Sequence, residues 1–203
     1  MSFAALGLSP ALLATLQERG YHTPTTIQAR VIKPILAGRD LIASAQTGTG
    51  KTAGFALPML HKLAAGAKVT ANQARALVLV PTRELAVQVG DSITAYAAGL
   101  SLRVAVAYGG VKINPQLMMM RRGADVLVPP PADCWTCTAA TRCAFSSWKC
   151  LCSTKPTACW RWASLMNSAT SSPCYLDAVR ACCSPLPSRP RAALLPAVCC
   201  ATL

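Results

Sequence analysis

The two parts of this sequence each lack residues that the other part contains. Residues 1–128 have no cysteine and no tryptophan, whereas all 11 cysteines and all four tryptophans follow Val128. Residues 129–203 have no glycine, although the chain contains 12. An apolar content of 53% would suit one domain with a sizeable core. This average describes neither part, so we consider residues 1–128 and 129–203 separately.

The sequence also lacks a signal peptide and an apolar run that could span a membrane. Its start, MSFAALGLSP, has neither a basic residue nor a long apolar stretch. The run AALLPAVCCATL near the other end is too short to cross a bilayer and contains Pro196. Both absences favour a cytoplasmic protein without membrane contact. In that compartment eleven cysteines do not predict a disulfide scaffold.

Acidic residues are scarce in both parts. Residues 1–128 carry 13 Lys and Arg against 5 Asp and Glu, a net charge of +8, and residues 129–203 carry 7 against 2, a net charge of +5. A basic balance is typical of proteins that bind nucleic acid, but an ordinary solvated surface can have it too. The charge alone leaves both interpretations open.

Apolar strands and helical patterns alternate along residues 1–128, which is typical of an α/β domain built on a parallel sheet. The predicted strands are near-continuous apolar runs, as in sheets covered on both faces, and they cover residues 40–45, 74–80, 102–108 and 124–128. Helical spacing covers residues 10–19, 51–65, 83–98 and 115–122. We expect Gly20 to end the first helix and Pro58 to interrupt the second.

The segment AQTGTGKT, Ala45 to Thr52, is the most specific local signal. It departs from the usual phosphate-loop pattern only in having Ala45 where the first glycine is expected. Gly48 and Gly50 would let the backbone amides turn inward around a phosphate. Lys51 would place a charge on the outer phosphates, and the Thr52 hydroxyl can ligate Mg²⁺. A strand precedes the segment and a helix follows it, so we predict a nucleotide site rather than an ordinary glycine-rich turn. Its predicted residues are Ala45, Gln46, Thr47, Gly48, Thr49, Gly50, Lys51 and Thr52, with Lys51 and Thr52 also assigned to catalysis.

Three further segments occur in the order found in DEAD-box RNA helicases, and residues 1–128 therefore resemble that family. GYHTPTTIQ, residues 20–28, resembles its adenine-recognition motif. PTREL, residues 81–85, resembles a motif that grips the RNA backbone, and Gly109-Gly110 follows the next strand. Four motifs in register are hard to assign to chance, and AGRDLIASAQTGTGKTAGFALPML is similar to the bacterial RhlE-like branch.

The resemblance implies a RecA-like fold, with ATP and Mg²⁺ as cofactors and RNA as the partner. Residues 1–29 would include the adenine-recognition region, in which Gln28 hydrogen-bonds the adenine edge, Tyr21 packs on the base and Phe3 is the upstream aromatic residue. Without the resemblance, Tyr21 would be a core residue and Gln28 a surface residue. The resemblance further implies RNA contacts to phosphate and sugar, independent of sequence, through Pro81, Thr82, Arg83, Glu84, Gly109 and Gly110.

The resemblance stops at Val128. Members of the family continue with segments like ATPGRLLDL and LVLDEADRML, whose acidic pair holds Mg²⁺ and positions the attacking water. Neither segment occurs here, and the loss of that strand should expose the edges of its neighbours in the sheet. Regrouping the codons after one lost base near Val128 turns PPPADCW into ATPGRLL and CSTKPTAC, residues 152–159, into LDEADRM. Tryptophan has a single codon, which fixes the first base of the next regrouped codon. The regrouped residues that follow Trp135, Trp148 and Trp162 all suit the family.

Residues 129–203 are therefore predicted to be out of frame and disordered. A zinc site is the alternative, because Cys134 and Cys137 have ligand spacing and Cys150 and Cys152 lie nearby. No second pair has knuckle spacing and no histidine follows His61, so we expect no zinc.

By this resemblance the function is that of an ATP-dependent RNA helicase, in which ATP hydrolysis drives duplex unwinding. The chain as printed lacks the acidic motif and the second domain, and we expect it to be inactive. A non-enzymatic nucleotide- or RNA-binding fragment and a product without function are the alternatives.

Overall fold

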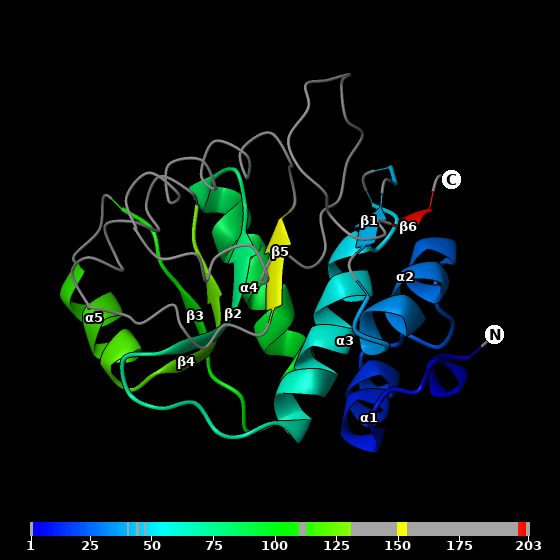
Figure 1. Cartoon of the computed structure of the whole chain (residues 1–203), viewed down its shortest axis with the longest axis horizontal. Helices are drawn as coiled ribbons and strands as arrows, with labels where there is room; N and C mark the ends of the chain where they lie inside the picture. The colour runs from blue at the N-terminus through cyan, green and yellow to red at the C-terminus, as the bar shows by residue number, and fades with distance from the viewer. Residues whose placement is uncertain are drawn as a thin grey trace.

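The computed structural model describes residues 2–39, 41–43, 45–46, 48–109, 113–130, 150–153 and 199–201. A parallel sheet with helices packed against it forms the centre of this part of the chain (Figure 1). This confirms the α/β fold predicted from the sequence.

The described elements alternate between helix and strand from Lys51 to Val128, as the sequence predicts. A 3-10 helix, η1 (Phe3–Leu6), and two helices, α1 (Pro10–Glu18) and α2 (Thr26–Leu36), come first. They are followed by β1 (Leu41–Ala43), α3 (Lys51–Ala65), β2 (Ala74–Leu79), α4 (Arg83–Tyr96), β3 (Val104–Val106), α5 (Ile113–Arg121) and β4 (Ala124–Val128). Two short strands, β5 (Cys150–Ser153) and β6 (Cys199–Ala201), complete the list.

One prediction about the helices was wrong, and one helix was not predicted. α3 continues from Lys51 to Ala65 across Pro58, which is buried in the helix, so this proline does not interrupt it. α2, with the sequence TIQARVIKPIL, was not predicted. Its apolar side chains Ile27, Val31, Ile32 and Ile35 are buried, with the four-residue spacing of a core-facing helix.

In the part of the chain that the structure describes, the strands of the sheet form two parallel ladders. One has the order β3-β4-β2-β5 and the other pairs β1 with β6. In the larger ladder Ala76 of β2 faces Val126 of β4, which in turn faces Val104 of β3. The ladder extends by single backbone bonds past the strand ends, from Val80 N to Pro129 O and from Ala107 N to Val128 O. The carboxyl ends of β2, β3 and β4 therefore lie at one edge of the sheet, toward the top of Figure 1.

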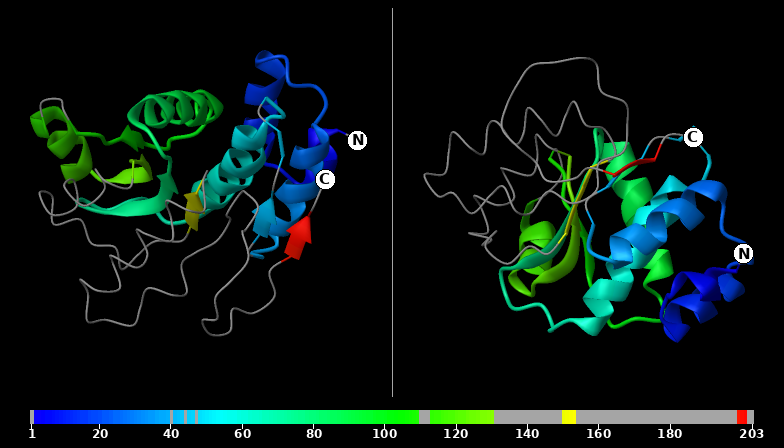
Figure 2. Two further views of the ribbon diagram at one scale, coloured as in Figure 1. Left: turned by 90° about the horizontal axis from the view of Figure 1, so that it is seen from above. Right: turned by 45° about the vertical axis from the view of Figure 1, so that its right-hand side comes forward.

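Helices lie on both faces of the larger ladder. From β1 the chain passes β5 to reach β2, and from β2 it passes β4 to reach β3. It then turns back to β4. Because such crossovers are right-handed, α3 and α4 lie on one face of the sheet and α5 lies on the other. Figure 2 shows this arrangement. Gly90 of α4 permits the closest approach, because a Cβ atom there would lie 2.2 Å from Cγ2 of Val106. α2 packs outside α3, and α1 contacts α4.

A buried ion pair ties the amino ends of β2 and β4 together. Nη1 of Arg75 lies 2.6 Å from Oδ1 of Asp125, and both side chains are buried. Nη2 of Arg75 donates to the Leu63 carbonyl at the end of α3, and Oδ2 of Asp125 accepts from the Arg103 amide before β3. One polar cluster therefore joins three strands and a helix at the edge opposite to their carboxyl ends.

Two of the described strands belong to residues 129–203. β5 pairs with β2 from Ala76 to Leu79, so β2 has a partner on each side. The expectation that loss of the acidic strand exposes the edge of β2 is therefore wrong. Apart from Pro129, Pro130, β5 and β6, this segment falls outside the described residues, and its predicted disorder stays a prediction. Among the described residues, no helix combines the length and the apolar character needed to cross a membrane.

Candidate nucleotide site and nucleic-acid interface

The phosphate loop lies between β1 and the first turn of α3. Gly48 and Gly50 have φ values of 84° and 81°, a left-handed conformation that favours glycine. Thr49 Oγ1 donates to the Gln46 carbonyl over 2.7 Å, and Lys51 Nζ donates to the Ala45 carbonyl. The loop thus closes on itself directly before a helix amino terminus, where amides and the helix dipole attract phosphate. Thr47 lies outside the described residues.

Gln28 connects the adenine-recognition segment to this loop. Its side chain is 1% exposed, its Oε1 accepts from the Thr25 amide over 3.0 Å and its Nε2 donates to the Gly50 carbonyl over 3.1 Å. Thr25 Oγ1 also donates to the Thr49 carbonyl over 2.9 Å. A Cβ atom at residue 50 would lie 2.3 Å from Gln28 Nε2, so this position needs glycine for space as well as for backbone conformation. Gln28 is therefore buried, and the expectation of a surface residue, which applies without the family resemblance, is wrong.

The two aromatic residues predicted for the base differ in exposure. Tyr21 is 38% exposed, and its ring meets that of Tyr96 at 79° with centroids 6.0 Å apart. Phe3 is 4% exposed and belongs to the core cluster of η1, α1 and α2. Tyr21 is therefore not a core residue, and one side of it is available for a ligand. The roles of both residues against a base stay predictions.

Thr52, the residue predicted to ligate Mg²⁺, is among the described residues. Thr52 is half-buried in the first turn of α3, one residue after Lys51. Among the described residues no group of three His, Cys, Asp or Glu side chains could hold a metal ion.

The predicted RNA contacts lie at the carboxyl ends of β2 and β3. Pro81 and Thr82 follow β2, and Thr82 caps α4 by accepting from the Leu85 amide over 3.3 Å. Hydrogen bonds from its own backbone amide and from Thr82 lower the pKa of the exposed Glu84 carboxyl. Thr82, Arg83 and Glu84 are exposed, and the Arg83 guanidinium has the charge that suits a phosphate group.

Gly109 follows β3 at the same edge, while Gly110 falls outside the described residues. Gln116 of α5 was missed by the sequence analysis. Its amide forms hydrogen bonds with both backbone groups of Tyr108, the residue before Gly109. A glutamine seven residues after Gly109 on a predicted helix was the available signal.

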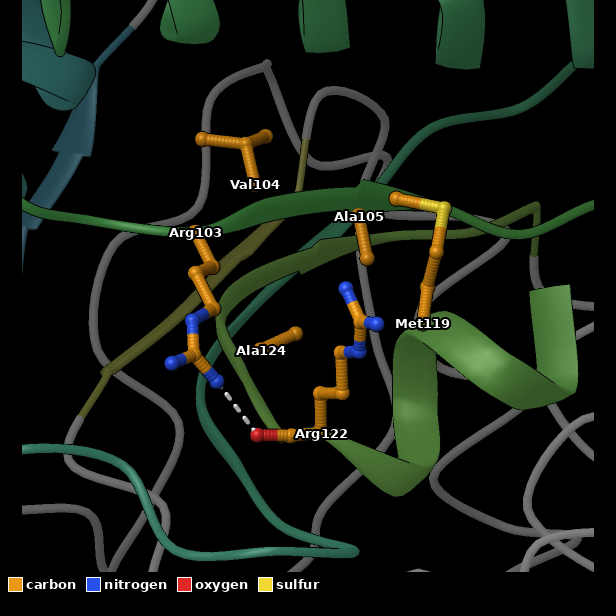
Figure 3. A pocket seen from close by; sticks show the side chains of 7 residues that line it. Arg103, Val104, Ala105, Met119, Arg122 and Ala124 are labelled. Atoms are coloured by element: carbon orange, nitrogen blue, oxygen red, sulfur yellow. Dashed lines mark hydrogen bonds between the residues drawn. The ribbon is translucent and has the colours of Figure 1, made fainter. Parts of the chain in front are cut away.

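A cavity of about 650 Å³ lies elsewhere among the described residues. It opens at the amino ends of β3 and β4, beside α5, and Arg103 Nη1 donates to the Arg122 carbonyl at its edge (Figure 3). Its lining residues are Arg103, Val104, Ala105, Met119, Arg122, Gly123 and Ala124. Because the phosphate loop and PTREL lie at the carboxyl edge, this cavity is separate from both candidate sites.

The fold and the phosphate loop together define a phosphate-loop nucleotide-binding domain on a parallel sheet. The sequence model of the DEAD/DEAH box helicase family matches residues 25–151, and the chain belongs to this family.

Relatives with curated names agree with this assignment. The chain is 48% identical over 131 residues to the ATP-dependent RNA helicase DeaD of Mycobacterium tuberculosis, and 44% identical over 141 residues to the DEAD-box ATP-dependent RNA helicase 52A of Oryza sativa. Each match covers 64% of this chain and 23% of the relative. The chain thus spans about a quarter of the length of these relatives. The finer placement in an RhlE-like branch stays a prediction.

Solved structures show the same fold. The RNA helicase Prp28 from Chaetomium thermophilum bound to ADP superposes with a TM-score of 0.75 at 28% identity, covering 90% of this chain and 44% of that one. A DEAD box protein from the hyperthermophile Methanococcus jannaschii gives 0.74 at 27% identity, covering 92% and 51%. The RecA-like fold predicted from the sequence is therefore confirmed, and the boundary at Val128 stays a prediction.

Proposed function

We propose that this chain binds adenine nucleotides at the phosphate loop and RNA backbone at the carboxyl edge of β2 and β3. These are the two ligands of an ATP-dependent RNA helicase, the function in which its relatives are named. The observation that carries the proposal is the bridge from Gln28 to Gly50, which joins the adenine-recognition segment to the loop.

The chemistry of Gln28 supports a choice of adenine. A side-chain amide has two N–H donors and an oxygen with two lone pairs, and Thr25 and Gly50 use one of each. One N–H and one lone pair remain. They complement the N7 acceptor and the N6 donor of adenine, whereas guanine presents two acceptors, N7 and O6, on the same edge.

The residues of the loop fit the phosphates. Lys51 supplies the positive charge, and the first amides of α3 can donate to phosphate oxygens. When bound, Mg²⁺ would neutralise charge on the phosphate oxygens, and Thr52 is the described residue placed to hold it. An isolated hydroxyl does not make a complete metal site, so we expect nucleotide binding to depend weakly on Mg²⁺ in the printed chain.

Exchange of Lys51 for alanine tests the nucleotide site. In the full chain we expect Lys51→Ala to weaken ATP binding at least tenfold, since it removes a charge-assisted contact of roughly 1.5–3 kcal/mol. Lys62→Ala is the matched control, because Lys62 is an exposed lysine near the other end of the same helix. Fluorescence titration with ATP and GTP gives both affinities. Equal binding of the two nucleotides, or an equal effect of the two lysines, would contradict the proposal.

RNA binding without turnover is a second candidate function. Its support is the strand order β3-β4-β2, which brings PTREL and Gly109 to the same edge of the sheet. This arrangement does not require the acidic motif. RNA binding that persists in the absence of ATP hydrolysis, measured by filter retention over a range of salt concentrations, would favour this candidate over a complete helicase.

A further inference from the structure

Gln116 makes an unusual contact with the main chain that leads into Gly109. Its Oε1 accepts from the amide of Tyr108 over 3.1 Å, and its Nε2 donates to the carbonyl of the same residue over 3.0 Å. One side-chain amide therefore bonds both polar backbone groups of one residue, from an element that follows it in the chain.

The position of this contact explains its value. β3 ends at Val106, and the ladder to β4 continues only as far as the bond from Ala107 N to Val128 O. Tyr108 is the next residue, at the point where the chain leaves the sheet. Gln116 there does what a neighbouring strand would do, and it fixes the direction in which the chain enters Gly109.

A fixed entry matters because two glycines follow. Glycine loses more conformational freedom on ordering than any other residue, so Gly109 without a fixed residue before it would cost more to order around a ligand. We propose that Gln116 is a positioning residue for RNA binding, which acts by holding Tyr108 and thereby aligning the backbone that enters Gly109. This inference rests on the RNA-binding function proposed above.

Three variants of the full chain test it. Gln116→Ala removes both hydrogen bonds, and Gln116→Glu keeps the acceptor but cannot donate to the Tyr108 carbonyl in its ionised form. Asn114→Ala is the matched control, because Asn114 is an exposed amide on the same helix. Affinity is measured by anisotropy with a short fluorescent single-stranded RNA of mixed sequence, and ATP affinity is measured on the same samples.

We expect Gln116→Ala to weaken RNA binding roughly fivefold to thirtyfold, because the backbone at Tyr108 would then have to be ordered when RNA binds, and Asn114→Ala to leave it unchanged. Gln116→Glu should resemble the alanine variant. The salt dependence separates positioning from charge. Arg83→Ala should make the negative slope of log affinity against log salt less steep by about 0.7, whereas Gln116→Ala should leave that slope unchanged.

The outcomes divide between the two proposals. No RNA binding by the unmodified chain overturns the RNA function and this inference with it. If the unmodified chain binds RNA, equal affinities of the Gln116→Ala and Asn114→Ala variants overturn the inference alone. A fall of ATP affinity by the same factor as RNA affinity also overturns it, because it would show a general loss of structure.

Discussion

The larger ladder, β3-β4-β2-β5, and the smaller one, β1-β6, carry different halves of the candidate site. The larger ladder presents PTREL and Gly109, and the ion pair of Arg75 and Asp125 locks its opposite edge. The smaller ladder carries the phosphate loop on a strand of three residues, Leu41–Ala43, which forms no ladder with the other described strands except β6. Among the described residues, the half predicted to bind RNA therefore follows strands of the larger ladder, and the half predicted to bind nucleotide follows a strand of the smaller one.

This contrast shows how the phosphate loop is supported. Helices support it on one side, because α3 packs on α4 and α2 packs on α3. Gln28 and Thr25 add polar contacts to Gly50 and Thr49. Side chains at the start of α2 thus help to fix the geometry of the loop.

Of the changes considered, we expect restoring the reading frame to have the largest effect, because it would join the two halves of the site. β5 lies on the side of β2 that faces β1 (Figures 1 and 2). The regrouped codons begin the acidic segment at Cys152, so the restored carboxylates would follow this strand at the carboxyl edge. They would complete the Mg²⁺ site beside Thr52 and orient water, the positioning on which phosphoryl transfer depends. We expect RNA-stimulated ATP hydrolysis and short-duplex separation from the restored chain and neither from the printed chain.

An assay of ATP hydrolysis and duplex separation, run in parallel on the printed and the restored chain, tests this prediction. Loss of preorganised groups in such sites costs roughly a hundredfold to a thousandfold in rate, so the difference should exceed a hundredfold. Comparable activity of both chains would show that the frame interpretation is wrong about function. Inactivity of both would show that it is wrong about what was restored.

Breaking the buried ion pair should destabilise the larger ladder. Arg75→Met leaves the buried Asp125 carboxylate with only the Arg103 amide, and removal of one partner of a buried pair costs about 3–5 kcal/mol. Urea unfolding followed by circular dichroism measures the loss. The double variant with Asp125→Asn removes the stranded charge and keeps an acceptor for Arg103, so it should recover part of the stability. No recovery would mean that the lost contact with the Leu63 carbonyl accounts for the effect.

Much of this arrangement could be predicted from the sequence, and the exceptions have physical causes. β2, β3, β4 and the phosphate loop follow from local patterns, since apolar runs and a glycine-rich turn are consecutive in the sequence, whereas β5 was not predicted. α3 passes through Pro58 because burial of its apolar neighbours outweighs one lost backbone bond. The burial of Gln28 and the contact of Gln116 with Tyr108 could not be read from local patterns, because each joins elements that meet only in the folded chain.

The smallest effect is expected at Tyr96, whose contact with Tyr21 links the two halves of the candidate site. Tyr96 belongs to α4, which packs on the larger ladder, and Tyr21 begins the segment that leads to Thr25 and Gln28. Burial, followed by the hydrogen bond with Tyr21, raises the pKa of the Tyr96 hydroxyl above its ordinary value. A raised pKa means that the fold favours the neutral hydroxyl. Its stabilising contribution is complete below the unfolded pKa of about 10 and declines as the pH rises above it.

Tyr96→Phe keeps the ring and removes the hydroxyl, which lies 3.5 Å from that of Tyr21. Because this contact is long and half-exposed, we expect a loss of less than about 1 kcal/mol at pH 7. Above pH 10 the order should reverse in part, since the variant has no hydroxyl at this position to ionise, and its stability should fall less steeply than that of the unmodified chain. Thermal unfolding at pH 7, 9, 10 and 11 measures both effects. Parallel stability curves for the two proteins across this range would show that Tyr96 does not titrate with unfolding, and that the junction between the two halves depends on ring packing alone.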